Sequence, residues 1–371
     1  MGTVRKSKEK YYSLNNILHR EAQYNIIIGE RSNGKTYACL KYALENFVKN
    51  KKQTAILRRW QVDLKGRRAS TLFDALVADG TVSKITNGEY NIIHYYAGKW
   101  YFAQRDEDTG KAVYDSNNPF AYAFTLSDNE HDKSTSYPFI NTIIFDEFLT
   151  RQSYLADEFV TFMNVLSTII RQRNDVKIFM LGNTVNKHAP YFKEMGLTHV
   201  KDMKQGSIDV YQYGETGLKV AVEYCASVGK AKASNVYFAF NNPRLSMINT
   251  GAWELDIYPH LPREYKYKPS DIVFQYFIEF EENLLQCEIV QKNDSIFTFI
   301  HNKTTPLKEE EEDIIFSLIN DPRPNFYVSI LRPVDELSRK IIDFFRKEKV
   351  FYQDNEVGEI VRNYTDSLLS R

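Results

Sequence analysis

The sequence predicts an α/β fold that holds a parallel sheet in the first half of the chain and a smaller α+β domain in the second. Short apolar runs alternate with amphipathic stretches in the first half, and a glycine-rich loop joins the first run to the first amphipathic stretch. Farther along, strand-like runs follow one another with only short polar turns between them, which is typical of an antiparallel meander. These three features point to a layered sheet followed by a separate domain.

The composition excludes several classes of protein. The 371 residues include 48 Lys plus Arg and 48 Asp plus Glu, so bulk positive charge cannot hold a polyanion. The three cysteines are too few for a disulfide framework and lack a zinc-binding spacing. These few cysteines favour a reducing cytosol. No apolar run reaches the roughly 18–20 residues of a membrane span, so we expect no membrane contact.

The elements of the first half follow from their apolar patterns. Residues 24–28 form an apolar run before Gly29, as expected of a buried parallel strand, and residues 36–48 carry a helical apolar stripe. We expect further strands at residues 54–57, 141–145 and 177–181, with a helix over residues 154–171.

The second half of the chain has a different pattern of expected elements. We expect a hairpin from residues 210–213 and 218–224, a lid or linker over residues 226–235, and a boundary near Pro259. The meander is expected at residues 272–280, 284–291 and 296–301, and a closing helix at residues 335–348. The expected domains are residues 1–205, a lid or linker segment at 206–255, and residues 256–371.

A phosphate-binding motif lies between the first strand and the first helix. The pattern G-x-x-x-x-G-K-[ST] makes a loop whose N–H groups surround phosphate oxygens. The residues expected to bind ATP are Gly29, Glu30, Arg31, Ser32, Asn33, Gly34, Lys35 and Thr36. Lys35 would neutralise the β- and γ-phosphates during catalysis, and the Thr36 hydroxyl would ligate Mg²⁺. The alternative is a glycine-rich turn with an exposed lysine.

An acidic pair ends the expected strand at residues 141–145. The carboxyl ends of parallel strands meet at one edge of the sheet, so Asp146 would hold Mg²⁺ near the loop and Glu147 would orient the attacking water. A helix cap is the alternative. Asp-Glu at this position marks the additional-strand, catalytic-glutamate (ASCE) branch of P-loop ATPases, which includes ring translocases, helicases and packaging motors.

A third element follows the strand at residues 177–181. Asn183 comes directly after Gly182, and its amide would contact the γ-phosphate and sense hydrolysis. A turn with Asn in the left-handed region is the alternative.

Basic residues suggest a contribution from a neighbouring subunit. Arg171 and Arg173 end the helix after the acidic pair, and we take Arg171 as the arginine that acts on a neighbour's nucleotide. Cations favoured at a helix C-terminus are the alternative. The run of Arg58, Arg59, Lys65, Arg67 and Arg68 is either solvated surface or faces a neighbour, and Lys65 is our choice for a second trans-acting contact.

These motifs resemble the DNA-packaging (encapsidation) ATPases of small tailed bacteriophages with protein-primed replication, relatives of the large terminase subunits. The resemblance lies in Arg31 inside the phosphate loop, the Ile-Ile-Phe-Asp-Glu-Phe segment and the Leu-Gly-Asn-Thr segment. It implies a homopentameric ring in the host cytoplasm, docked on the capsid portal of a prohead. That ring would translocate double-stranded DNA by hydrolysing ATP between subunits, with packaging RNA as a partner.

The same resemblance implies an RNase H-like C-terminal domain. Terminases use this domain as a metal-dependent nuclease, which needs several converging acids. Asp271, Glu279 and Asp321 are the candidates here, and surface carboxylates are the better interpretation, so we expect an inactive nuclease. Two other functions remain open: a hexameric helicase or translocase of the same branch, and a non-hydrolysing ATP-dependent nucleic-acid switch.

Overall fold

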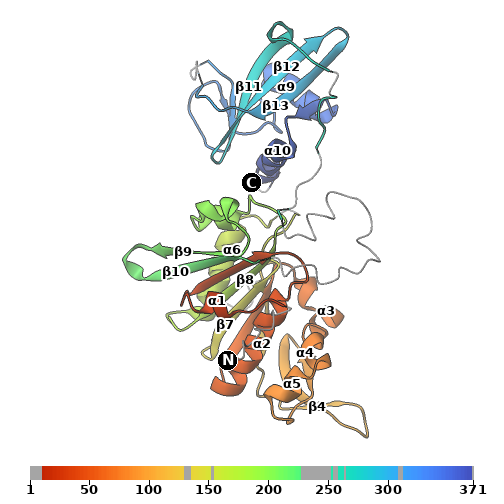
Figure 1. The fold of residues 1–371 in the computed structure, drawn as a ribbon, viewed down its shortest axis with the longest axis vertical. Coiled ribbons are helices and arrows are strands. Elements are labelled where there is room, and N and C mark those ends of the chain that lie inside the picture. The colour runs from red at the N-terminus through yellow and green to blue at the C-terminus, as the bar shows by residue number, and fades with distance from the viewer. Residues whose placement is uncertain are drawn as a thin grey trace, which may run out of the picture. The chain divides into compact units, whose positions relative to one another are not determined.

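The structure is a computed structural model of the 371-residue chain. It describes residues 11–128, 135–151, 154–226, 252–253, 258–262, 265–307 and 312–369. The chain divides into two compact units, Met1–Glu254 and Leu255–Arg371 (Figure 1). Of the lid expected at residues 226–235, all but the first residue lies outside the described residues.

The first unit is built on a sheet whose central strands run parallel. In spatial order the strands are β3-β4-β6-β2-β7-β8-β1-β10-β9, and β5 pairs with β4. Their bounds are β1 Tyr24–Gly29, β2 Gln53–Arg58, β3 Ile92–Tyr96, β4 Lys99–Arg105, β5 Ala112–Tyr114, β6 Ala121–Thr125, β7 Ile140–Asp146, β8 Lys177–Asn183, β9 Ser207–Tyr213 and β10 Leu218–Tyr224.

The strand order assigns this sheet to the predicted branch of folds. Strand β8 lies between β1, which leads into the glycine-rich loop, and β7, which ends in the acidic pair, and it pairs parallel to both. The inserted β8 is the additional strand from which the branch takes its name. The ASCE-type α/β fold predicted from the motifs is therefore confirmed.

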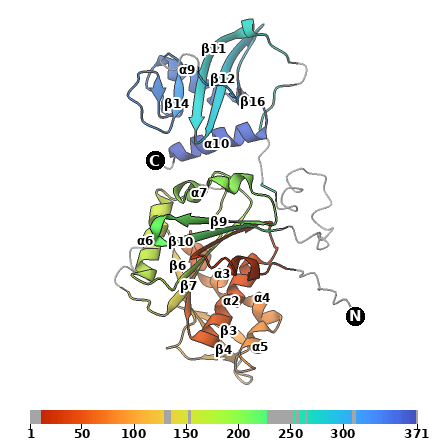
Figure 2. The ribbon, with the colours of Figure 1, turned by 60° about the vertical axis from the view of Figure 1, so that its left-hand side comes forward.

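Helices cover both faces of this sheet (Figure 2). Alternate residues of β1 point to opposite faces: Ile26 and Ile28 join the core beneath α6, whereas Ile27 joins the core beneath α2. The α-helices of the unit are α1 Asn15–Leu18, α2 Lys35–Asn50, α3 Gly66–Ser70, α4 Asp74–Ala78, α5 Thr81–Ile85, α6 Glu158–Ile170 and α7 Pro190–Glu194. Short 3₁₀ turns occur at Gln61–Leu64, Thr198–Asp202 and Gly214–Thr216.

The expected strands and helices of the first half are confirmed, with two differences. Helix α6 begins at Glu158 rather than at residue 154, because Asp157 has a left-handed backbone with φ of 48°. The hairpin of β9 and β10 was expected in a lid or linker, and the structure instead places it in the main sheet. The reason is that β10 pairs parallel with β1 from Tyr24 to Ile28.

The second unit holds a six-stranded sheet in the order β15-β14-β11-β12-β13-β16. Strands β11, β12 and β13 form the predicted antiparallel meander, whereas β14 and β16 pair parallel to β11 and β13. The elements are β11 Ile272–Phe280, β12 Asn283–Lys292, β13 Ser295–Asn302, β14 Ile315–Ser317, β15 Phe326–Tyr327, α9 Glu336–Arg346, β16 Val350–Tyr352 and α10 Asn355–Leu369, with a 3₁₀ turn at Pro269–Asp271.

The helix expected at residues 335–348 is confirmed as α9, and its start has a clear cause. Asp335 accepts a hydrogen bond from the Ser338 backbone N–H at 2.7 Å, which caps the N-terminus of α9. Ile341 on α9 and Ile360 on α10 pack on one face of the sheet. No helix in the described part of the chain is long and apolar enough to cross a membrane.

A polar pair on the other face of this sheet should make the stability of the second unit depend on pH. Glu288 on β12 lies 3.5 Å from His301 Nε2 on β13, and this hydrogen bond raises the pKa of His301. A raised folded-state pKa stabilises the fold below the unfolded pKa of about 6.5, and this contribution is lost as pH rises through the folded value.

We therefore expect amide protection factors in β12 and β13 of the full chain to fall between pH 6 and pH 8, after correction for intrinsic exchange rates. The His301→Asn variant should lose most of this slope. An equal slope in both proteins would contradict the assignment to His301.

Candidate nucleotide-binding site

The glycine-rich loop connects β1 to α2 and needs glycine at two positions for different reasons. A Cβ on Gly29 would come within 2.9 Å of the Cys225 Cβ, which is closer than real contacts allow. Gly34 has φ of +96°, in the left-handed region, and is the residue directly before Lys35 at the start of α2. The loop therefore delivers the next two side chains at a helix N-terminus, where anions are favoured.

Lys35 is a buried cation in this loop. Its ammonium donates to the carbonyl oxygens of Gly29 at 3.3 Å and Glu30 at 2.6 Å, and to the side-chain oxygens of Asn33 at 3.2 Å and Asn183 at 3.3 Å. Burial lowers the pKa of Lys35. No described carboxylate lies within ion-pair distance of it, so this ammonium fits an anionic ligand.

The expected magnesium ligands face each other. The Thr36 hydroxyl at the start of α2 lies 3.3 Å from both carboxylate oxygens of Asp146 at the end of β7. Asp146 is only 7% exposed. A hydroxyl and a carboxylate beside a phosphate loop form the oxygen donor set that Mg²⁺ prefers, so these residues fit the predicted metal.

The residue after Asp146 has an unusual backbone. Glu147 has φ of +62°, and its side chain is 64% exposed, as expected of a group that must meet a water molecule. Arg58, the last residue of β2, forms ion pairs with both carboxylates: its guanidinium lies 2.7 Å from Asp146 and 2.7 Å from Glu147. The two acids are therefore balanced by one arginine of the same chain.

These groups line one cavity of about 260 Å³. Three loop residues after β1 and the first three residues of α2 form one side, and the ends of β7 and β8 form the other. The lining residues are Ser32, Asn33, Gly34, Lys35, Thr36, Tyr37, Asp146, Glu147, Leu181, Gly182 and Asn183. The structure thus brings together Lys35, Thr36, the acidic pair and Asn183, although Lys35 and Asn183 are 148 residues apart in the sequence.

Some expected site residues do not line this cavity. Gly29, Glu30 and Arg31 belong to the loop but are absent from the described lining, and two of them present carbonyls to Lys35. Lys65, expected to act in trans, precedes α3 and is likewise absent from the described lining.

Arg171 lies at the opposite edge of the sheet from the cavity of its own chain. It directly follows α6, and its guanidinium donates to the carbonyl of Thr135 at 2.9 Å. Thr135 precedes the start of β7 at Ile140, whereas Asp146 ends that strand. A strand of this length spans about 20 Å, so Arg171 is too far from its own acidic pair to act on it.

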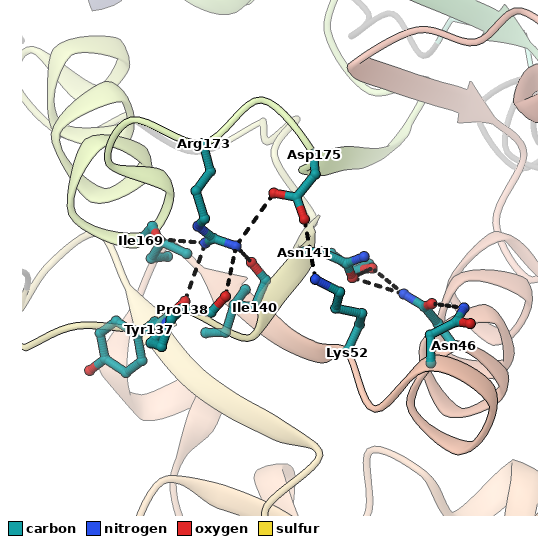
Figure 3. Close-up of polar contacts among 11 residues, drawn as sticks. Asn46, Lys52, Tyr137, Pro138, Ile140, Asn141, Ile169, Arg173 and Asp175 are labelled. Carbon is teal, nitrogen blue, oxygen red and sulfur yellow. Dashed lines mark hydrogen bonds and ion pairs between the residues drawn. The ribbon is translucent and has the colours of Figure 1, made fainter.

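Arg173 has a structural role at that same edge (Figure 3). Its guanidinium donates to the carbonyl oxygens of Ile169 at 2.9 Å and Ile140 at 2.5 Å, and to those of Tyr137 and Pro138 at 3.2 and 3.3 Å. These bonds satisfy carbonyls at the C-terminal end of α6 and the entry to β7. Both candidate arginines thus bond to their own chain, Arg173 through four carbonyl oxygens and Arg171 through that of Thr135.

The sequence interpretation missed the location of Arg58 and Arg59. Both were grouped with Lys65 as solvated surface or as contacts to a neighbour, whereas the structure buries Arg59 and directs Arg58 to the acidic pair of the same chain. The signal that could have placed them is strand direction. Strand β2 pairs parallel with β7, so residues at the carboxyl ends of the two strands lie at the same edge of the sheet.

Comparisons with known proteins agree with this geometry. Residues 6–215, more than half of the chain, match the model of a family described as podovirus DNA encapsidation protein (Gp16). The DNA packaging protein of Bacillus phage B103 is 27% identical over 176 residues, which cover 47% of this chain and 48% of that protein. The DNA packaging protein of Bacillus phage phi29 is 26% identical over 188 residues, 50% of either chain.

The chain thus spans about half the length of the curated relatives that it matches. A solved structure described as the bacteriophage Phi-29 viral genome packaging motor assembly is 20% identical, with a TM-score of 0.57 over 98% of this chain and 100% of that one. At this identity the match establishes a shared fold over both units.

Proposed function

The chain belongs to the podovirus DNA encapsidation protein (Gp16) family, and on this premise we propose that it is an ATPase that drives double-stranded DNA into a phage prohead. The observation that carries the proposal is the convergence of Lys35, Thr36, Asp146, Glu147 and Asn183 on one cavity. A buried ammonium, a hydroxyl–carboxylate pair and an exposed glutamate are the groups that ATP hydrolysis needs.

In this mechanism the residues of the chain have separate tasks. The loop amides and Lys35 would hold the triphosphate, and Thr36 and Asp146 would hold Mg²⁺, which would supply positive charge beside the phosphates. Glu147 orients and deprotonates the attacking water. Asn183, whose side-chain oxygen accepts from Lys35 at 3.3 Å, turns its amide so that the NH2 group donates to the γ-phosphate, and it passes phosphate release onward.

The site also needs a neighbour. Because Arg171 lies at the far edge of the sheet, it is suited to reach the nucleotide of an adjacent subunit, with Lys65 as a second contact. We therefore propose a ring, pentameric by family resemblance, that assembles in the host cytoplasm and docks on the capsid portal. Packaging RNA is a proposed partner of the same ring.

We propose that the second unit is an RNase H-like domain without nuclease activity. Within its six-stranded sheet, the part β13-β12-β11-β14-β15, in which three antiparallel strands are followed by two parallel ones, supports the fold, and β16 adds a parallel strand beside β13. Asp321 is paired with Arg323 at 2.9 Å, and Asp271 accepts from the backbone N–H of Lys268 at 2.8 Å. In the described part of the chain no three acidic, His or Cys side chains are placed to share a metal ion.

A packaging assay tests the proposal. Proheads, the full chain, ATP and linear double-stranded DNA are combined, and DNA that has entered the capsid is measured by its resistance to nuclease. We expect protection that requires both ATP and proheads and is abolished by Lys35→Ala. ATP-dependent unwinding of forked DNA without proheads would instead favour the helicase, and DNA binding without phosphate release would favour the switch.

A further inference from the structure

A second arginine lies directly behind the acidic pair. Arg59 is 6% exposed, and its guanidinium reaches the backbone on one side and a carboxylate on the other. It donates to the carbonyl of Phe148 at 2.7 Å and to that of Glu147 at 3.3 Å. The other side of the same group forms an ion pair with Glu158, with N–O distances of 2.7 and 2.9 Å. One buried cation thus joins the catalytic segment to helix α6.

Glu158, the first residue of α6, is well suited to anchor this arginine. It is 2% exposed, and in addition to Arg59 it accepts from the Tyr191 hydroxyl at 2.7 Å and from the backbone N–H of Leu155 at 2.8 Å. Burial, together with the nearby Glu158 carboxylate, raises the pKa of Tyr191, so its hydroxyl remains a donor. The carboxylate is therefore fixed by several donors before it meets the guanidinium.

The backbone at Glu147 needs such support. A left-handed φ of +62° is a strained backbone conformation for a residue with a side chain. The side chain of Glu147 is mostly exposed, and among the described residues it forms an ion pair with Arg58. On the carbonyl side of Glu147, the N–H of the same peptide unit, that of Phe148, donates to the Leu181 carbonyl, and the Glu147 carbonyl itself accepts from Arg59. Loss of these contacts would let the backbone relax and move the carboxylate.

We propose that Arg59, held by Glu158, is a positioning residue that fixes the backbone of Glu147 and so aims its carboxylate at the attacking water. This inference rests on the proposed function, because it assigns Arg59 a part in ATP hydrolysis. Arg59 is not among the residues that line the described cavity; it acts through the carbonyl oxygens of Glu147 and Phe148. We call the Arg59–Glu158 pair the clamp.

Two clamp variants separate positioning from stability. Arg59→Lys keeps the charge next to Glu158, but a single ammonium cannot also reach both carbonyls in the same geometry. The double variant Arg59→Met/Glu158→Leu replaces the buried ion pair with apolar groups, which usually restores stability that a single substitution loses. It restores none of the bonds to the backbone. Tyr191→Phe is the matched control, since it removes one donor to Glu158 and leaves every contact of Arg59.

We expect both clamp variants to lower kcat by about 10- to 100-fold, because small displacements of a catalytic group have effects of this order. The affinity for ATP should stay within about threefold, since Lys35 and the loop are untouched. Melting temperature should fall in Arg59→Met and recover in the double variant, while kcat does not recover. Tyr191→Phe should keep kcat within about twofold of the wild type.

A readout without nucleotide accompanies the kinetics. Amide hydrogen exchange of the full chain is measured by mass spectrometry over the peptide at residues 145–151. In the wild type the Phe148 N–H donates to the Leu181 carbonyl at 3.2 Å, and the clamp holds the carbonyls beside it. We expect exchange in this peptide to be faster in Arg59→Lys and the double variant and unchanged in Tyr191→Phe.

The outcomes are distinct. Slower turnover together with faster exchange, at unchanged ATP affinity, supports the clamp. Wild-type turnover in Arg59→Lys and the double variant overturns it, whether exchange changes or not. If the wild-type chain releases phosphate no faster than Glu147→Gln, the proposed function fails, and this inference fails with it. The comparison of these two proteins shows that failure without any measurement on the clamp variants.

Discussion

Replacing Glu147 with glutamine should reduce ATP turnover by about 10²- to 10⁴-fold, the usual contribution of a general base. Glutamine has nearly the same shape but cannot take a proton from water. The loop, Lys35 and the Thr36–Asp146 pair are unchanged, so ATP should still bind with an affinity within a few-fold of the wild type. Phosphate release in the presence of DNA and equilibrium binding of a fluorescent ATP analogue measure the two quantities separately.

A matched control uses a carboxylate outside the cavity. Glu45 on α2 makes an exposed i,i+4 pair with Lys41 at 3.9 Å, so Glu45→Gln should keep wild-type turnover. DNA-stimulated release that persists in Glu147→Gln would show that another group activates water. Equally slow release by the wild type and Glu147→Gln would remove the motor hypothesis and leave the non-hydrolysing switch.

Much of the sheet edge that carries the candidate site could be predicted from the sequence because its signals are local. The glycine-rich loop sits between an apolar strand and an amphipathic helix, and Asp146, Glu147 and Asn183 each close a short apolar strand. In a parallel sheet these strand ends share one edge, so their meeting requires no long-range information beyond the strand direction.

Other features could not be predicted, for physical reasons. The hairpin of β3 and β4 turns through Ala97 and Gly98, both with positive φ, and alanine gives no signal for such a turn. The position of β10 beside β1 is a non-local pairing that composition does not encode. The clamp likewise depends on α6 returning beside β7, which brings Glu158 to an arginine 99 residues away.

The neighbour's contribution should be as large as that of the catalytic glutamate. Arg171→Ala is expected to lower kcat by about 10³- to 10⁵-fold, the range found when an arginine that stabilises the transferring phosphoryl group is removed. ATP affinity should change little, because no residue of the cavity is altered. Lys65→Ala, which removes the other expected contact, is measured in parallel, and both variants are assayed under conditions in which the ring assembles.

Mixing inactive subunits tests whether Arg171 acts in trans. An Arg171→Ala subunit retains Glu147, and a Glu147→Gln neighbour can supply it with Arg171, so a mixture of the two variants should hydrolyse ATP faster than either alone. Mixing Arg171→Ala with the double variant Arg171→Ala/Glu147→Gln should give no recovery, because no subunit then supplies the arginine. A mixture no faster than its components would contradict a trans-acting Arg171. The position of Arg171 at the far end of β7 from its own acidic pair would then have to be explained by its bond to the Thr135 carbonyl alone.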